Sequence, residues 1–372
     1  IGIDVNRSFV IDDQKSEYTK ILDFIEEDLI FFTGGLGPTI DDITRETVLE
    51  YFGVETYLDE DVLHNIKSYF DRMNISMKDT NNKQALMPKK GILLQNDLGT
   101  APGLYFKVNG KRIILLPGPP IELRPMLDTV IRNLKEELGT QLFSRGFKLV
   151  GTGESYMENK LNGFYQLYPN VNVAPYAGLG EIKYIFTSKS ETDLNACMND
   201  FYSRFHQYIY GTTEETLEGV VVQLLKEQSK TISFAESCTG GMVASTIVNV
   251  SGSSAVFKES FVTYANEAKI KNLNVTPSVL EEFGAVSNEC AYEMVKGLQY
   301  KTKADVCLSI TGIAGPTGGT EEKPVGLVYF GLYNDGEIKT YRRVFNGNRT
   351  MIRTRAMIYG LNAVRIELLK HK

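Results

Sequence analysis

The chain has 372 residues, of which 42% are hydrophobic and 23% charged, and its formal net charge is −6. This length exceeds one ordinary core and predicts two or three domains. The acidic balance excludes a broad nucleic-acid-binding surface, so we expect no direct DNA binding. We find no apolar stretch of membrane-spanning length and no secretory signal, and we therefore expect a cytoplasmic protein without membrane contact.

A glycine-rich turn dominates the first section of the chain, which we assign to residues 1–142. The apolar run 28–32 is typical of a buried parallel strand, and residues 40–49 have helical periodicity. Between them, glycines at 34, 35 and 37 would let the backbone approach a phosphate, with Thr39 beside it. Asp41 and Asp42 fall in the first turn of the expected helix. They either hold a divalent cation near a diphosphate or only favour the helix dipole.

Further turn signals follow in the same section. A second glycine loop covers 98–103, and Asn109-Gly110 predicts a hairpin that joins 103–108 to 111–116. Residues 116–120, Leu-Pro-Gly-Pro-Pro, precede a helix expected from Glu122 to about Leu138.

These motifs together resemble the MoaB and MogA molybdopterin-binding fold, and more closely the first domain of CinA proteins, which carries that fold. The resemblance implies a three-layer α/β domain with ADP-ribose pyrophosphatase activity that depends on a divalent metal such as Mg²⁺, with a contribution from potassium. The family pattern also implies an earlier strand and glycine loop. Because the chain begins at Ile1, we expect those residues to be missing.

The middle section, 143–212, changes character. A helix is expected to begin at 151–155, strands at 171–175 and 181–187, and an amphipathic helix over 193–208. We interpret this section as a small α+β, KH-like connector.

The last section, 213–372, alternates helices and strands. Helices are expected at 215–227, 242–248 and 349–369, strands at 231–234 and 305–310, and a hairpin turn at 334–336. The turn Phe234–Gly241, Phe-Ala-Glu-Ser-Cys-Thr-Gly-Gly, stands between a strand and a helix. A hydroxyl beside free backbone N–H groups there would bind an anion or an oxyanion, although a plain helix N-cap gives the same pattern.

Five ordered motifs extend the pattern over about 160 residues: the 234–241 turn, 261–269, 311–316, 323–326 and 345–349. Together they resemble the C-terminal domain of CinA proteins, the PncC-type nicotinamide mononucleotide (NMN) deamidases. The resemblance implies an α/β domain that hydrolyses the carboxamide of NMN to give nicotinic acid mononucleotide and ammonia.

Lysine is the expected base, because the three histidines lie outside these motifs and leave no Ser-His-Asp arrangement or His-ligated metal. Ser237, Ser254 and Lys269 are the candidate catalytic residues, with Ser254 slightly favoured as the nucleophile and Ser237 as a proton relay or phosphate ligand. No cofactor is expected here. The four cysteines are interpreted as buried small hydrophobes. The candidate substrate-binding residues are Gly240, Gly241, Gly252, Tyr264, Thr311, Gly312 and Arg349, with Arg353 competing with Arg349.

A different class of function stays open. The chain could be a non-catalytic accessory protein linked to competence or DNA damage, with pockets that bind nucleotides or partner proteins. In either case we expect a homodimer.

Overall fold

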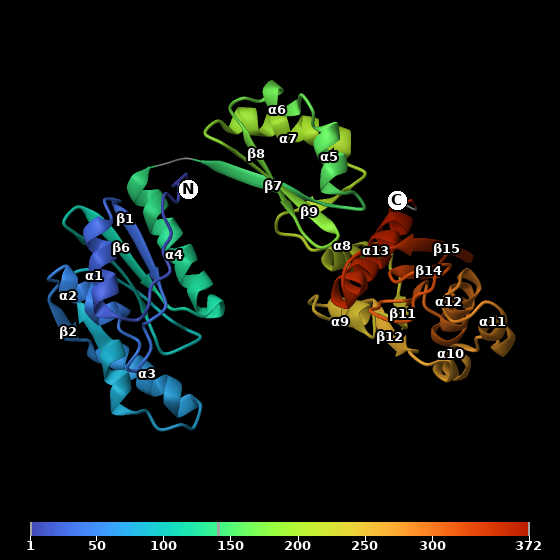
Figure 1. Ribbon diagram of the computed structural model, residues 1–372, viewed down its shortest axis with the longest axis horizontal. Helices are drawn as coiled ribbons and strands as arrows, with labels where there is room; N and C mark the ends of the chain where they lie inside the picture. The colour runs from blue at the N-terminus through green and yellow to red at the C-terminus, as the bar shows by residue number, and fades with distance from the viewer. Residues whose placement is uncertain (1, 140–141, 371–372) are drawn as a thin grey trace. The chain divides into compact units, whose positions relative to one another are not determined.

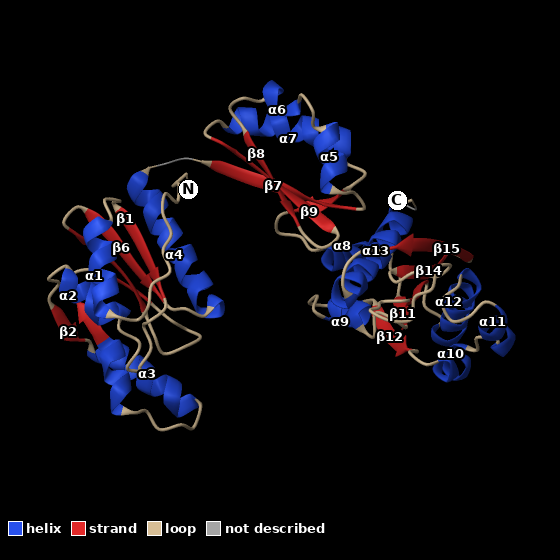
Figure 2. Ribbon diagram, in the orientation of Figure 1, coloured by secondary structure: helices blue, strands red, loops and turns tan. Residues whose placement is uncertain are grey.

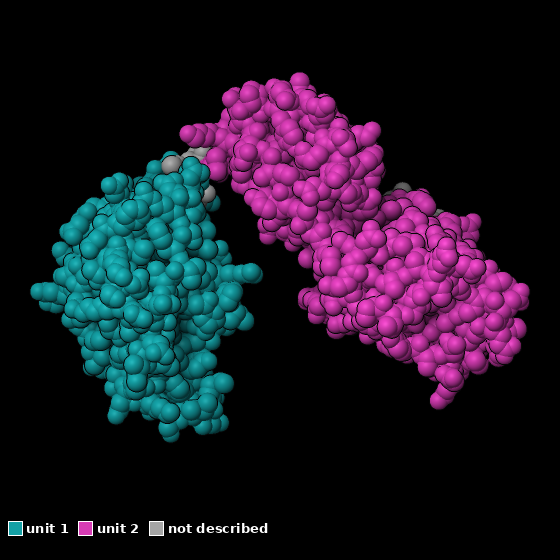
Figure 3. Space-filling model, in the orientation of Figure 1, with its two compact units in different colours: residues 1–141 teal, residues 142–372 magenta. Residues whose placement is uncertain are grey.

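A computed structural model describes residues 2–139 and 142–370 of the protein (Figure 1). The chain divides into two compact units, Ile1–Gln141 and Leu142–Lys372 (Figure 3). Helices and strands alternate in both units, which confirms the predicted mixed α/β fold (Figure 2). Among the described residues, no helix is long and apolar enough to cross a membrane.

The first unit is built on a four-stranded sheet of order β1-β6-β5-β4. β1 runs parallel to β6, and the other pairs are antiparallel. The strands are β1 (Leu29–Thr33), β2 (Thr56–Leu58), β3 (Leu86–Pro88), β4 (Ile92–Leu94), β5 (Gly103–Val108) and β6 (Lys111–Leu116). The helices are α1 (Lys15–Phe24), α2 (Thr44–Tyr51), α3 (Glu60–Arg72), the 3₁₀ helix η1 (Asp79–Ala85) and α4 (Pro120–Leu138).

Helices cover both faces of this sheet, because β6 is apolar on both sides. Ile113 and Leu115 pack into the core that α1, α2 and α3 share, whereas Ile114 and Leu116 pack against α4. This is the three-layer arrangement that the sequence predicts. The Asn109-Gly110 hairpin is also confirmed, with Val108 paired to Lys111.

The predicted helix 40–49 needs a correction, because α2 begins only at Thr44. Asp41 and Asp42 therefore lie before the helix rather than in its first turn. The Asp42 carboxylate accepts hydrogen bonds from the Thr39 amide and hydroxyl, which fold the 39–42 segment back on itself. This local bonding competes with helical bonding, as is common for aspartate near a helix start.

The second unit contains two sheets. The first has the order β10-β7-β9-β8 and is antiparallel throughout. Its strands are β7 (Phe143–Val150), β8 (Asn172–Ala177), β9 (Glu181–Ser188) and β10 (Ile209–Thr212), and its helices are α5 (Glu154–Lys160), α6 (Phe164–Leu167) and α7 (Glu191–Phe205). Phe201 of α7 lies at the centre of an aromatic core with Phe164, Tyr184 and Phe186. The α+β character of this section is as predicted. Its likeness to a KH domain and its separation as a domain of its own stay predictions.

The second sheet of this unit has the order β12-β11-β13-β14-β15. Its first three strands are parallel, and β14 and β15 are antiparallel additions. The strands are β11 (Ile232–Glu236), β12 (Phe257–Val262), β13 (Val306–Gly312), β14 (Leu327–Asn334) and β15 (Glu337–Val344). The helices are α8 (Leu217–Glu227), α9 (Met242–Val248), the 3₁₀ helix η2 (Ser253–Ala255), α10 (Asn266–Leu273), α11 (Pro277–Glu282), α12 (Asn288–Thr302) and α13 (Arg349–Leu369).

Alternating side chains of β13 show how this sheet is covered. Leu308 and Ile310 pack with α8, α9 and α13, whereas Cys307 packs with α10 and α12 on the other face. All four cysteines are free and buried, as predicted.

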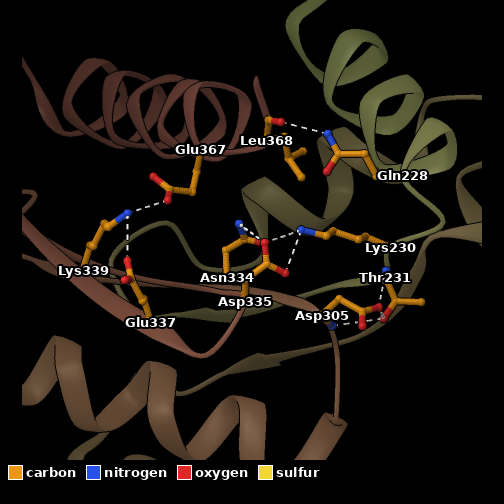
Figure 4. A network of polar contacts seen from close by, with 10 residues as sticks. All are labelled: Gln228, Lys230, Thr231, Asp305, Asn334, Asp335, Glu337, Lys339, Glu367 and Leu368. Atoms are coloured by element: carbon orange, nitrogen blue, oxygen red, sulfur yellow. Dashed lines mark hydrogen bonds and ion pairs between the residues drawn. The ribbon is translucent and has the colours of Figure 1, made fainter. Parts of the chain in front are cut away.

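Polar contacts tie together the amino-terminal edge of the parallel strands (Figure 4). Lys230 bridges to Asn334 (2.9 Å) and Asp335 (2.8 Å) at the β14–β15 turn, and Asp305 accepts hydrogen bonds from Thr231. On α13, the buried Glu367 pairs with Lys339 of β15. The opposite, carboxyl-terminal edge is left to loops, which is where ligands bind in open α/β sheets.

Candidate active site

The predicted residues of the C-terminal motifs meet at the carboxyl ends of β11, β12 and β13. Ser237 follows β11, Tyr264 follows β12, and Thr311 and Gly312 end β13. Because parallel strands end at the same edge of a sheet, residues that are far apart in the sequence lie around one hollow. A cavity of about 170 Å³ opens there, lined by Ser237, Cys238, Tyr264, Lys269, Ala285, Val286, Thr311, Gly312, Ala314 and Arg349.

Lys269 lies at the base of this hollow with its side chain almost fully buried, at 1% exposure. Its Nζ lies 3.1 Å from Ser237 Oγ and donates to the backbone carbonyls of Thr263 (2.8 Å) and Tyr264 (3.3 Å). A neutral amine has two N–H bonds and one lone pair. The two carbonyls can accept both hydrogens, which leaves the lone pair directed at the serine hydroxyl.

The surroundings of Lys269 favour that neutral form. Burial lowers the pKa of its amine, and the nearby thiols of Cys290 and Cys238 act weakly in the opposite direction. Burial also raises the pKa of Cys238 to about 12 and of Cys290 to about 11, so both thiols are uncharged at neutral pH. Across the described residues, no carboxylate forms an ion pair with Lys269. Backbone carbonyls, and no described carboxylate, are therefore the acceptors that a positive charge on Lys269 would meet.

The glycines of the 234–241 turn are arranged differently from the expectation. Gly240 (φ +62°) and Gly241 (φ +90°) adopt the left-handed conformation that glycine favours. Their amides are not free, however, since Gly240 N–H donates to the Ser237 carbonyl and Gly241 N–H to the Glu236 carboxylate (2.9 Å). Neither glycine therefore offers its N–H to an anion.

Glu236 is a site residue that the sequence reasoning missed. It is fully buried at the end of β11, and its carboxylate accepts hydrogen bonds from the amides of Gly241, Val243 and Ala244. These are the first N–H groups of α9, which have no partner within the helix. The sequence did carry a signal for this role, since an acidic residue precedes the serine of the strand-to-helix turn. A carboxylate at that position can cap the helix from inside the fold.

The two arginines of α13 have separate positions. Arg349, in the first turn of α13, lines the cavity and donates to the Tyr264 hydroxyl (3.0 Å) and the Gly315 carbonyl (2.7 Å). Arg353 instead donates to the carbonyls of Cys238 (3.0 Å) and Thr239 (2.8 Å). Of the two, Arg349 is the one that a ligand in the cavity would meet, whereas Arg353 holds the Ser237 turn in place.

Thr311 and Gly312 form part of the cavity wall. Thr311 is buried and its hydroxyl donates to the Ala285 carbonyl (2.7 Å). A Cβ on Gly312 would come within 2.8 Å of the Leu327 carbonyl oxygen, so packing against β14 explains this glycine.

The structure separates Ser254 from the other catalytic candidates, which corrects its expected role. Gly252 and Ser254 lie in the η2 segment before β12, and Val256 at its end accepts a hydrogen bond from Ile232, the first residue of β11. They are therefore at the amino-terminal edge of the sheet, whereas Lys269 meets Ser237 at the carboxyl-terminal edge. A five-residue strand spans roughly 13 Å. Ser254 is exposed and is not part of the cavity wall.

In the first unit, the three glycines of the turn after β1 differ in the space around them. Gly34 (φ +96°) has open space where a Cβ would point, and it lies against Gly118 of the turn after β6. A Cβ on Gly35 would instead collide with Thr44 Oγ1 at 2.1 Å, and one on Gly37 with the Asp42 carboxylate at 2.5 Å. Gly34 is thus the glycine with open space beside its backbone, whereas Gly35 and Gly37 make room for packed neighbours.

The expected metal ligands Asp41 and Asp42 fit a cation only in part. Burial raises the pKa of Asp42, but hydrogen bonds from Thr39 and Gly37 and the charge of Lys83 together lower it below its ordinary value, so the carboxylate is ionised. Within residues 2–139 and 142–370, no group of three or more His, Cys, Asp or Glu side chains could hold a metal ion. Magnesium characteristically uses one or two carboxylates together with substrate phosphates. A metal here would therefore need the substrate as a ligand.

Comparison with known proteins agrees with both sets of motifs. Residues 214–368 match the family model described as "CinA C-terminal domain", and residues 1–136 match the one described as "Probable molybdopterin binding domain". A CinA-like protein of Dictyoglomus turgidum is 42% identical over 99% of this chain and 92% of its own length. The chain belongs to the CinA family.

Other CinA relatives are similar to the whole chain or to part of it. A CinA-like protein of Kosmotoga olearia is 41% identical over 99% of this chain and 92% of its own length. The crystal structure of a CinA superfamily protein from Klebsiella pneumoniae is 32% identical over 41% of this chain and 96% of that chain, with a TM-score of 0.41.

Proposed function

We propose that the C-terminal site is a serine–lysine amidohydrolase that converts NMN to nicotinic acid mononucleotide and ammonia. The observation that carries the reaction type is the buried Lys269 amine 3.1 Å from the Ser237 hydroxyl. Uncharged surroundings and the direction of its pKa suit Lys269 to act as a general base at neutral pH. The choice of NMN rests on the resemblance to the PncC-type deamidases.

The reaction proceeds in two steps. Lys269 takes the Ser237 proton while Oγ attacks the carboxamide carbon, and the protonated amine then gives that proton to the departing nitrogen as ammonia leaves. The product of this first step is an ester of Ser237. Water, deprotonated by Lys269, attacks this ester, releases the carboxylic acid and returns the proton to Ser237.

Backbone amides after Ser237 are suited to stabilise the oxyanion of these steps. In the described part of the chain, the amides of Cys238 and Thr239 donate to no backbone carbonyl, whereas those of Gly240 and Gly241 are occupied. Arg353 fixes the carbonyls of both residues, which keeps their peptide groups in position. The amide of the residue after a nucleophilic serine is a recurrent oxyanion donor.

The cavity is too small to enclose the whole substrate. At about 170 Å³, it is smaller than the roughly 300–1,000 Å³ that enclose a drug-sized ligand. We infer that the nicotinamide ring enters the cavity while the ribose and phosphate stay near its mouth. Arg349 is the cation available there to pair with the phosphate.

Ammonia release from NMN by the full-length protein tests this function. Ser237→Ala should abolish turnover, whereas Ser254→Ala, a matched change of an exposed serine, should leave it within about twofold, since surface substitutions are usually near neutral. No ammonia from the folded wild-type protein would favour a non-catalytic accessory protein. Loss of turnover only in Ser254→Ala would restore Ser254 as the nucleophile.

For the first unit, we propose ADP-ribose hydrolysis at the glycine turn, supported by the open space over Gly34 beside Gly118. Asp41 and Asp42 would hold a divalent metal that neutralises the diphosphate. Release of AMP from ADP-ribose should then be lost in EDTA and restored by Mg²⁺, while ammonia release from NMN is unchanged. Hydrolysis of ADP-ribose that persists in EDTA would contradict the metal assignment. A homodimeric state and a cytoplasmic location complete the proposal, and the former is testable by analytical ultracentrifugation.

A further inference from the structure

A second cavity, in the second unit, is lined by a buried arginine, and one guanidinium nitrogen of this arginine has no hydrogen-bond partner among the described residues. The cavity has a volume of about 850 Å³ and lies between α7, β10, α8 and the last turns of α13. Arg365 of α13 lines it and is 4% exposed. Its Nε donates to Asn362 Oδ1 (3.1 Å), but one terminal guanidinium nitrogen is buried without any hydrogen-bond partner.

This arrangement is costly for the protein alone. A buried guanidinium with an unused donor loses its hydration without compensation. Burial lowers the pKa of Arg365, and the nearby Tyr210 hydroxyl acts only weakly in the opposite direction. Arginine remains charged under such conditions. An oxyanion in the cavity would supply the missing partner.

The other residues that line the cavity indicate what kind of molecule carries this anionic group. The first turn of α8, with Thr216 and Gly219, faces the cavity and presents the positive end of a helix. Apolar side chains form much of the remaining surface, namely those of Ile209, Val220, Leu224, Ile366 and Leu369, with Tyr202 and Tyr210.

Three glutamates limit the charge of the ligand. Glu215 accepts hydrogen bonds from the Thr212 amide and hydroxyl, Glu214 from Thr213, and Glu227 from Gln223. All three line the same cavity. The negative charge of these three carboxylates opposes the binding of an anion, and it opposes a ligand with several negative charges most strongly.

We propose that this cavity is a binding site for a small apolar monocarboxylate, held through its carboxylate by Arg365. The site is separate from the deamidase site, which lies at the other end of α13 around Arg349. One helix, α13, carries both arginines.

Binding of 2-naphthoate to the full-length protein, measured by calorimetry, tests the proposal. We expect saturable binding with a Kd of about 1 mM or tighter, the weak end of specific affinities. The neutral isostere 2-naphthamide should bind at least about tenfold more weakly, since it lacks the charge that Arg365 recognises. 2-Naphthyl phosphate, a dianion with the same ring system, should also bind more weakly.

Arg365→Met removes the charge at nearly constant length and should abolish discrimination between naphthoate and naphthamide. Arg132→Met, an exposed arginine of the first unit, is the matched control and should bind as the wild type does. Val220→Phe, which places a larger side chain in the cavity and keeps Arg365, should weaken the binding of both ligands. Absence of naphthoate binding by the wild type, or equal binding by a folded Arg365→Met, would overturn the proposal. Tighter binding of 2-naphthyl phosphate would replace the monocarboxylate with a phosphate ester.

Discussion

Two turns of this molecule share a sequence pattern but use their glycines in different ways. After β11, Gly240 and Gly241 turn the chain so that the buried Glu236 can cap α9, and the hydroxyl of Ser237 faces Lys269. After β1, Gly35 makes room for Thr44, while Gly34 is left open. The first turn brings a serine hydroxyl to a buried lysine, and the second leaves open space beside the backbone of Gly34.

The difference shows that a glycine-rich strand-to-helix turn does not specify an anion site by itself. The helix amides bind an anion only where no carboxylate of the protein has already taken them. Glu236 occupies them in the C-terminal turn. In the N-terminal turn, the carboxylate of Asp42, which lies just before α2, bonds to Thr39.

The largest expected effect comes from removing the base. Lys269→Met should lower kcat for NMN deamidation by at least about 100-fold while the protein stays folded, because an acid–base group is lost. Lys271→Met, an exposed lysine on the same helix, is the control and should be near normal. Ammonia release measures both, and near-normal turnover of a folded Lys269→Met variant would remove Lys269 from the mechanism.

The pH dependence sharpens the same assignment. Only neutral Lys269 can accept the serine proton, so kcat/KM should rise about tenfold per pH unit on the acid side and level off once the amine is neutral. Because burial lowers this pKa, the plateau should begin below 10.5, the ordinary lysine value. A rate that still climbs at pH 10.5 would mean that the environment does not depress the pKa.

In the N-terminal turn, replacing each of two neighbouring glycines with alanine should change the stability of the first unit by different amounts. Both have positive φ, but only the Cβ of Gly35→Ala meets Thr44 Oγ1 at 2.1 Å. Gly35→Ala should therefore lower the free energy of unfolding of the first unit by about 1–3 kcal/mol more than Gly34→Ala does. Urea denaturation would measure this, and equal stability of the two variants would contradict the packing role of Gly35.

In the C-terminal turn, the corresponding change is Glu236→Gln. An amide nitrogen would then face backbone N–H groups that now donate to a carboxylate, at a cost of about 1–3 kcal/mol in unfolding free energy. Thr33→Ala, at the matching strand end of the other turn, is exposed and should cost less than about 0.5 kcal/mol. Thermal and urea unfolding would compare the two, and a neutral Glu236→Gln would show that the cap is dispensable.

The smallest effect concerns stability at high pH. The folded pKa of Lys269 is lower than its unfolded value, so this lysine destabilises the fold most below the folded pKa, and the penalty disappears as pH rises towards 10.5. The stability of the wild type relative to Lys269→Met should therefore increase between neutral pH and pH 10.5. If the difference in urea midpoint between the wild type and Lys269→Met stayed constant with pH, burial of the charged Lys269 would not destabilise the fold.

The sequence by itself determined the elements and much of the site. Periodicity and turn residues predicted β5, β6, α9, β13 and α13 closely, because those signals are local. The motifs also placed Tyr264, Lys269 and Arg349 at one site, and the structure brings them together. The role of Lys269 as the base followed from the lack of a nearby histidine and stays a prediction.

Only the tertiary structure decided which serine meets that lysine. Ser254 is nearer to Lys269 in sequence, but it precedes a parallel strand, and Ser237 follows one. Strand direction thus sends the two serines to opposite edges of the sheet. The same holds for Glu236, Gly35 and Arg365, whose roles depend on what packs against them across the fold. A local sequence pattern predicts the conformation of its own segment. It does not predict which distant groups hydrogen-bond to that segment or pack against it.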